Sequence, residues 1–207
     1  MSDTDAPFEI HVHGDVPLRD DVAYEQIQEA LKPMWQYVGA RSLAAAAESN
    51  YEDEPGIRFD AEAHQLQVCW TIDGDDDFRQ AMEDTCMGLN DIAANGAPLE
   101  VSFYDTEFDD EDENAEGEAR DDFVMYFVGP TPAAIMQVQR DLLVQDVVQV
   151  MERHFDAAEL GEVVGAIDRL FHQRFDALVN SMQLGRPPRG HGGAPGHGGP
   201  RKPRHLH

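Results

Sequence analysis

The chain has 207 residues, of which 42% are apolar, and its formal net charge of −26 is distributed unevenly. Residues 1–184 contain all 41 acidic residues and ten of the 15 basic ones, a formal charge of −31, whereas residues 185–207 contain five basic residues and no acidic residue. A negative field repels nucleic acid phosphates and anionic membranes and attracts cations and basic protein surfaces. The composition therefore argues against nucleic acid and membrane partners for residues 1–184.

The cysteines and the N-terminus indicate a cytoplasmic protein. Cys69 and Cys86 form no CxxC pair, and the chain is much larger than a disulfide scaffold, so we expect reduced intracellular thiols. The first residues lack the basic and apolar regions of a secretion signal, and no apolar run approaches the roughly 18 residues of a membrane span. The chain is long enough to bury a substantial hydrophobic core.

Alternating apolar and polar residues predict a first strand over residues 8–12, closed by a turn at Gly14–Asp15. Apolar residues at intervals of three and four then predict a helix over 24–38, which Pro33 should kink because it removes a backbone donor. A weaker helical stretch over 40–49 follows. This part of the chain therefore predicts a strand and then helices.

Two further alternating runs, 57–59 and 66–72, are separated by a short polar connection and predict a hairpin. Helical spacing follows over 78–92, and alternation returns over 99–103. The resulting β-α-β-β-α-β order is that of a ferredoxin-like sandwich, in which two helices lie on one face of an antiparallel sheet.

The acidic loop at residues 105–122 contains 11 acidic residues and precedes an apolar run over 123–128 that predicts a further strand of the same sheet. Two long helices with wide apolar faces are then predicted, and they must pack on each other, on the sheet or on a second copy of the protein. We therefore expect an α+β fold with a ferredoxin-like sheet within residues 1–128, a helical hairpin at 129–184 and a disordered Gly, Pro, His and Arg-rich tail at 185–207.

One candidate metal site is visible in the sequence. His11 and His13 are two residues apart on a predicted strand, so both point to the same face, and Asp15 follows shortly. These three residue types can bind zinc or another divalent cation, although two outward histidines that follow Glu9 on the same face also suit a solvated sheet face. The chain contains no GxSxG, phosphate-loop, GxGxxG or HExxH motif, so no catalytic residue is predicted and the metal is the sole candidate cofactor.

The acidic loop has three interpretations: a solvated connection, a docking site for a basic partner, or a loose cation site. Its central acidic residues are the candidate partner-binding residues, namely Asp109, Asp110, Glu111, Asp112 and Glu113. They do not match the DxDxDG calcium loop. The five basic residues of the tail can contact nucleic acid weakly, but the tail has no aromatic residue for base stacking, so contact with the acidic body is the simpler expectation.

These patterns favour a non-catalytic binding or adaptor protein of the cytoplasm. In this hypothesis the C-terminal helices self-associate, giving a homodimer, and the acidic loop is offered to a basic partner. The alternative is a small metal-binding protein or metal-dependent enzyme that uses His11, His13 and Asp15.

Overall fold

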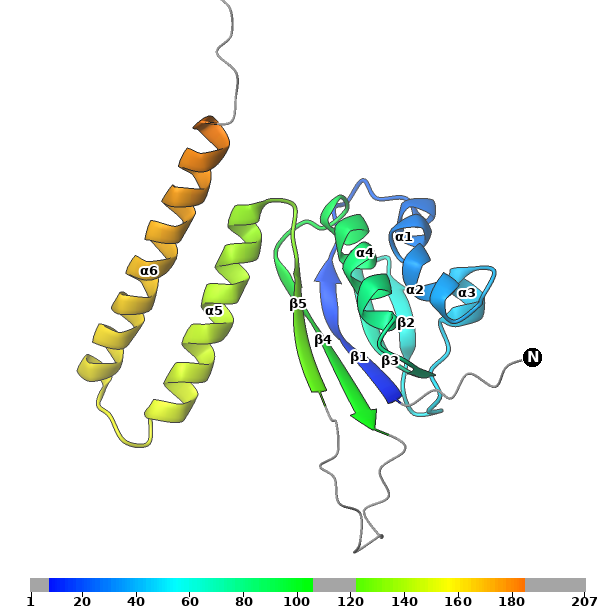
Figure 1. Ribbon diagram of the computed structural model, residues 1–207, viewed down its shortest axis with the longest axis horizontal. Helices are drawn as coiled ribbons and strands as arrows, with labels where there is room; N and C mark the ends of the chain where they lie inside the picture. Colours follow the sequence, from blue (N-terminus) through cyan, green and yellow to red (C-terminus); the bar gives the residue numbers. More distant parts are fainter. Residues whose placement is uncertain (1–7, 106–121, 185–207) are drawn as a thin grey trace, which may run out of the picture.

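Five antiparallel strands form one sheet in the computed structural model, which describes residues 8–105 and 122–184 (Figure 1). The strand order is β2-β3-β1-β4-β5, so β1 lies in the centre. Ile10 of β1 stands opposite Ile72 of β3 on one side and Phe103 of β4 on the other. The strands are β1 (Phe8–Pro17), β2 (Gly56–Asp60), β3 (Gln65–Gly74), β4 (Ala97–Asp105) and β5 (Asp122–Val128).

Four helices pack against one face of the sheet, and two longer helices lie beyond β5 (Figure 1). The four on the face are α1 (Tyr24–Ala30), α2 (Lys32–Tyr37), α3 (Leu43–Ala46) and α4 (Phe78–Asn90). The two longer helices, α5 (Pro132–Met151) and α6 (Ala157–Leu184), run alongside each other. None of the helices in the described ranges has both the length and the apolarity needed to cross a bilayer.

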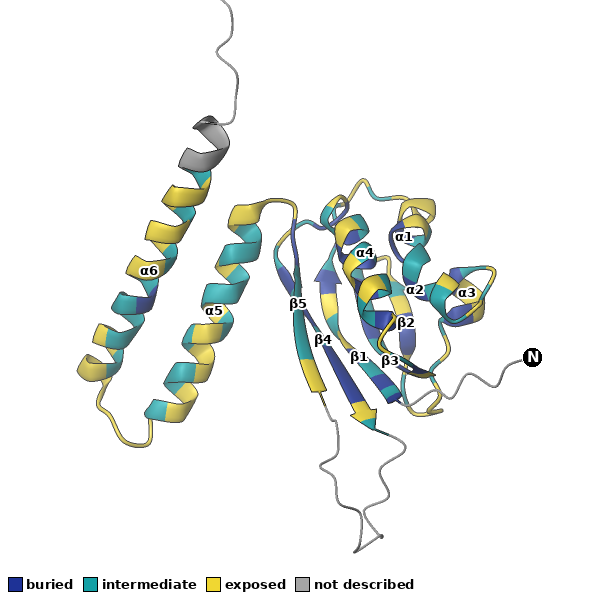
Figure 2. Cartoon of the chain, in the orientation of Figure 1, coloured by how far each residue is buried: buried dark blue, intermediate teal, exposed yellow. Residues whose placement is uncertain are grey.

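The core lies between the sheet and helices α1 to α4, where every second residue of the central strands is buried (Figure 2). Aromatic rings form its centre: Phe103 packs edge-on against Phe8, with ring centroids 5.8 Å apart, and against Phe78 at 6.4 Å. Trp70 is fully buried, and its indole nitrogen donates to the carbonyl oxygen of Glu48. The burial of these rings supplies much of the hydrophobic stabilisation of the sheet.

The prediction of an α+β fold with an antiparallel sheet is confirmed, and the sheet has five strands. The ferredoxin-like assignment is not confirmed. A plain β-α-β-β-α-β sandwich has four strands, whereas β5 continues this sheet beyond β4 and changes the strand order.

The predicted end of the first strand at Gly14–Asp15 is wrong. Strand β1 continues to Pro17, and Gly14 pairs with Val68 of β3. Gly14 has φ +155°, and a Cβ atom there would lie 2.7 Å from the carbonyl oxygen of Pro98. The glycine therefore permits the close approach of β4 instead of ending the strand.

The predicted kinked helix is two short helices, α1 and α2, which meet at Leu31. Pro33 lies in the first turn of α2, where a missing N–H costs nothing, so the proline starts a helix instead of bending one. The weaker stretch over 40–49 contains four helical residues, α3.

Both long C-terminal helices begin at capped residues. The Thr131 hydroxyl accepts a hydrogen bond from the Ala134 amide at 3.1 Å, and Pro132 follows at the start of α5. At the start of α6, Asp156 and Glu159 exchange backbone-to-side-chain hydrogen bonds in a capping box. The tail at 185–207 and residues 106–121, including the candidate partner-binding residues Asp109 to Glu113, lie outside the described residues.

Candidate functional site

The face of the sheet that turns away from α1 to α4 carries polar residues on its central strands. Strand alternation places His11 and His13 of β1 on this face. The pairing register sets Thr71 of β3 directly opposite His11, and Cys69 of β3 directly opposite His13. Helices α5 and α6 lie beyond β5 and leave these central strands uncovered (Figure 1).

The segment between α3 and β2 brings a carboxylate onto this face. Its backbone extends the pairing of β3, because the Asn50 amide donates to the Thr71 carbonyl at 2.9 Å and the Thr71 amide donates to the Ser49 hydroxyl at 2.8 Å. The Tyr51 hydroxyl then reaches across to the carboxylate of Glu9, on β1, at 2.6 Å. These contacts hold the segment in place, and Glu54 lies at its end beside His11.

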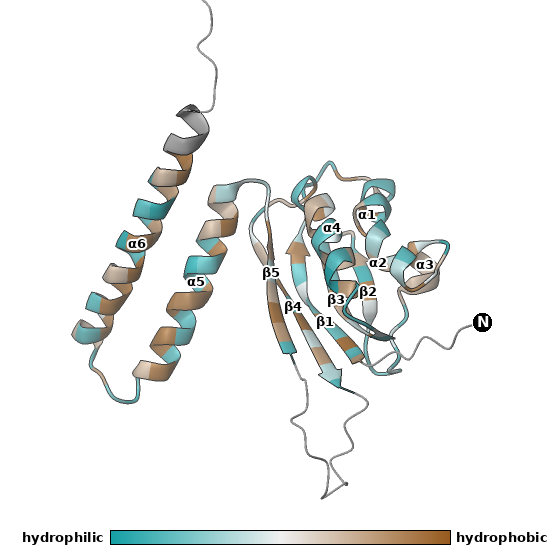
Figure 3. Ribbon diagram, viewed as in Figure 1, coloured by the Kyte–Doolittle hydropathy of each residue, from teal (hydrophilic) through white to brown (hydrophobic). Residues whose placement is uncertain are grey.

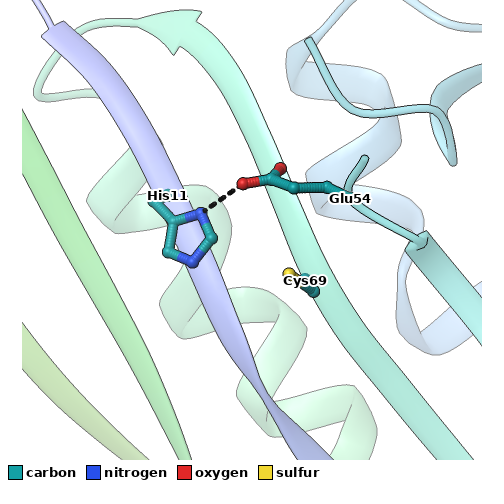
Figure 4. A group of neighbouring side chains, drawn as sticks. All are labelled: His11, Glu54 and Cys69. Carbon is teal, nitrogen blue, oxygen red and sulfur yellow. Dashed lines mark ion pairs between the residues drawn. The ribbon is translucent and has the colours of Figure 1, made fainter. Parts of the chain in front are cut away.

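Glu54, Thr71 and His11 form a connected hydrogen-bond network. The Thr71 hydroxyl donates to Oε1 of Glu54 at 3.0 Å, and the Ser49 hydroxyl donates to Oε2. Because the Thr71 proton points to Glu54, the Thr71 oxygen accepts from Nδ1–H of His11, which lies 2.8 Å away. The same Nδ1 atom lies 3.3 Å from Oε1 of Glu54 (Figure 4). The network fixes the orientation of the imidazole ring.

Cys69 completes this group. A ring nitrogen of His11, a carboxylate oxygen of Glu54 and Sγ of Cys69 all lie within 4.8 Å of one another (Figure 4). Burial opposes ionisation of Glu54, but hydrogen bonds from Ser49 and Thr71 and the nearby His11 hold the pKa of Glu54 below its usual value. Burial, together with the charges of Glu54 and Asp53, raises the pKa of the Cys69 thiol.

Of the three metal ligands predicted from the sequence, His11 alone belongs to this group. The ring of His13 stacks beside that of His11 with centroids 6.2 Å apart, and His13 is exposed. Asp15 is exposed as well and stands opposite Gln67. Sequence reasoning missed Glu54, because this residue lies between α3 and β2 and no strand register relates it to His11.

The helical pair offers a second candidate site, an incompletely buried apolar surface. Among the described side chains of α5 and α6, only Ile167 is buried, and it is still 9% exposed, whereas Leu143, Val150 and Leu170 are exposed. Apolar residues occur along α5 and along the coloured part of α6 (Figure 3). An ion pair between Arg140 of α5 and Asp168 of α6, at 2.6 Å, joins the two helices.

Two hollows of about 600 Å³ each lie along the junction of α5 and α6. Both are bordered by Met136 and Phe171; the first also includes Leu170, and the second includes Phe175. Hollows of this kind on a helix pair are available to apolar side chains of another helix.

Comparison with protein families gives one result. A family of unknown function, DUF6806, matches residues 8–172. The chain belongs to this family. The matched range starts with β1 and ends within α6, so it includes both the His11 group and most of the helical pair. Searches of curated proteins and of solved structures found no match.

Proposed function

We propose that this protein is a non-catalytic binding protein that forms a homodimer through α5 and α6 and offers its acidic segment, residues 105–122, to a basic partner. The observation that carries the proposal is the exposure of the helical pair. Leu170 is 64% exposed and Val150 is 73% exposed, while Ile167 alone is buried among the described side chains of the two helices. Two helices with apolar surface on several sides need a further layer to bury it.

Charge indicates the surface through which two copies of the chain would meet. Residues 129–184 contain eight acidic residues and four arginines, whereas residues 1–128 have a formal charge of −27. Two acidic copies therefore repel each other least when they meet through the helical pair. Two hairpins packed about a twofold axis also form a four-helix bundle, in which each pair of helices fills the hollows of the other.

The mass of the protein in solution tests the homodimer. Light scattering at high micromolar concentration is expected to give twice the chain mass, and Leu170→Glu is expected to give the monomer mass because it places a charge in the contact. Met87→Glu is the matched control, since Met87 is 62% exposed on α4, away from the helical pair. A monomeric native protein, or a dimer that persists in Leu170→Glu, would refute the proposed dimer.

The proposed partner of residues 105–122 is a basic protein surface. The support is the sequence: 11 of these 18 residues are acidic, and the candidate contact residues Asp109 to Glu113 are consecutive. Long-range attraction of this kind accelerates association with a basic partner and weakens at high salt.

Two further parts of the hypothesis concern architecture and location. The order of β1, the helices α1 to α3, β2, β3, α4 and β4 supports a ferredoxin-like origin for residues 8–105, to which β5 was added. The free thiols of Cys69 and Cys86 support a cytoplasmic location. The basic tail supports, at most, weak and salt-sensitive contact with nucleic acid.

A further inference from the structure

We propose that His11, Glu54 and Cys69 bind a zinc ion on the open face of the sheet. The three side chains come from β1, from the segment before β2 and from β3, and their ligand atoms already lie within 4.8 Å of one another (Figure 4). This site goes beyond the proposed binding function and shares only His11 with the set predicted from the sequence.

The spacing of two of the ligand atoms suits zinc. With bonds of about 2.0 to 2.1 Å to nitrogen and oxygen, two ligands at tetrahedral positions lie about 3.3 Å apart. Nδ1 of His11 and Oε1 of Glu54 are 3.3 Å apart. A zinc ion can therefore replace the proton on Nδ1 while these two atoms keep their separation. The hydrogen bond from Nδ1 to Thr71 is then lost, and the imidazole carries its proton on Nε2.

Neighbouring hydroxyl groups hold the carboxylate ligand. Thr71 and Ser49 each donate to a different oxygen of Glu54, and Thr71 is 1% exposed, so the carboxylate is oriented from the interior of the sheet. Hydrogen bonds to ligating carboxylates are the usual second layer of metal sites, where they fix ligand geometry. Oε1 still has a lone pair for the ion, because the hydrogen bond from Thr71 uses only one.

The mixed ligand set selects the metal. Calcium and magnesium take oxygen ligands, whereas nitrogen, oxygen and sulfur together suit zinc. Binding converts the Cys69 thiol to a thiolate and releases its proton to solvent. Burial and the charges of Glu54 and Asp53 raise the pKa of this thiol when no cation is present, and the same two carboxylates attract a cation. Water occupies the fourth position in this proposal, since the three ligands are only half-buried.

Cobalt(II), a coloured substitute for zinc, tests the site in the full-length protein purified without nickel resin. Titration is expected to produce the ultraviolet charge-transfer absorption of a cobalt–thiolate bond, saturating at one ion per chain, and zinc is expected to displace it. The histidines of the tail cannot produce this absorption, because they provide no sulfur. Cys69→Ser is expected to abolish it, and the matched variant Cys86→Ser is expected to keep it, since Cys86 is buried in α4.

A second pair of variants tests His11. His11→Gln is expected to weaken zinc binding at least tenfold, whereas His154→Gln, at an exposed position, is expected to leave it unchanged. Zinc should also raise the melting temperature of the native protein but not that of Cys69→Ser. Absence of the thiolate absorption, or its persistence in Cys69→Ser, would overturn the proposal and leave the group as a hydrogen-bonded ion pair. Neither result depends on whether the chain is a dimer.

Discussion

Tyr37 is the residue that ties α2 to the start of α4. Its hydroxyl donates to Oδ1 of Asp75 at 2.8 Å and accepts from the Asp75 amide at 2.7 Å. Its ring packs edge-on against Phe78, with centroids 5.1 Å apart. Burial first, and then the charges and hydrogen bond of Asp75, raise the pKa of Tyr37 to about 12.

This pKa predicts a loss of stability at high pH. The unfolded chain releases the Tyr37 proton near pH 10, before the folded chain does, so the free energy of unfolding is expected to fall between pH 10 and about pH 12. Tyr37→Phe should lower the free energy of unfolding by about 1 kcal/mol at pH 7, because it removes the hydrogen bond to Asp75, and should reduce that decline. Urea unfolding at a series of pH values measures both effects.

The matched control is Tyr24→Phe, because Tyr24 is 47% exposed at the start of α1. It should leave both the stability at pH 7 and the alkaline decline close to those of the native protein. The interpretation fails if Tyr37→Phe declines with pH as steeply as the native protein does.

The candidate site was only partly predictable at this scale. The face on which His11 lies could be predicted, because alternation along a strand assigns residues to faces and requires only local sequence. The position of Glu54 beside His11 could not be predicted. Glu54 follows Glu52 and Asp53 in an acidic run, and only long-range hydrogen bonds bring it to His11: the Asn50 amide donates to the Thr71 carbonyl, and the Thr71 amide donates to the Ser49 hydroxyl.

At the scale of elements, strands and helices followed from periodicity wherever one face is buried. The alternation of β3 and the helical spacing of α4 reflect contact with the same core, so sequence and structure agree there. The ends of the strands and helices were less predictable. In isolation, Gly14 indicates a turn and Pro33 indicates a helix kink. In the structure, β1 continues through Gly14, and Pro33 lies in the first turn of α2, because tertiary contacts decide their roles.

Gly96 determines how closely α5 approaches the sheet. A Cβ atom at this position would overlap the carbonyl oxygen of Ala134, and it would also contact Val138 at 3.2 Å. Gly96→Ala is therefore expected to push the start of α5 away from β4 and to lower the free energy of unfolding by about 1 to 3 kcal/mol. Denaturant unfolding measures the loss.

Gly161 provides the opposite case on α6. Nothing lies within 4 Å of a Cβ atom there, so Gly161→Ala should raise stability by about 0.5 to 1 kcal/mol through helix propensity alone. The two alanine substitutions are chemically identical, and only the packing differs. Equal effects of both on stability would show that α5 is not seated against the sheet at Gly96.

At the scale of the whole molecule, the acidic segment connects the end of β4 to the start of β5, and both lie at the same end of the sheet (Figure 1). Arg79 lies at this end. Its guanidinium group forms an ion pair with the carboxylate of Asp122 at 2.5 Å and lies over the ring of Phe103, 4.0 Å from the ring centroid. One of the few basic side chains of residues 1–184 is therefore paired with the first residue of β5. Arg79 therefore neutralises one of the 11 acidic residues of the segment, and the large excess of formal negative charge over residues 105–122 supports the proposed attraction of a basic partner.

The long-range arrangement was predicted only in part. The sequence predicts β5 as a further strand of the sheet, but its register against β4 depends on pairing across residues 106–121, and their composition carries no register information. The apolar faces of α5 and α6 were predictable, but the choice among the sheet, each other and a second copy was not, because periodicity shows that a face is buried without showing what covers it.

Binding of a labelled lysine-rich peptide tests the charge argument for the molecule as a whole. Replacing Asp109, Asp110, Glu111, Asp112 and Glu113 by Asn and Gln is expected to weaken binding at least tenfold, since opposite charge supplies the attraction, and to reduce its dependence on salt. The control variant neutralises the same number of exposed acidic residues elsewhere, at Asp20, Asp21, Glu25, Glu62 and Glu83. Both variants have the same net charge. If residues 105–122 are the specific binding segment, a large loss of peptide binding is expected only for the variant at residues 109–113. Equal losses would mean that the peptide senses the overall field of the protein, and residues 105–122 would then have no distinct role.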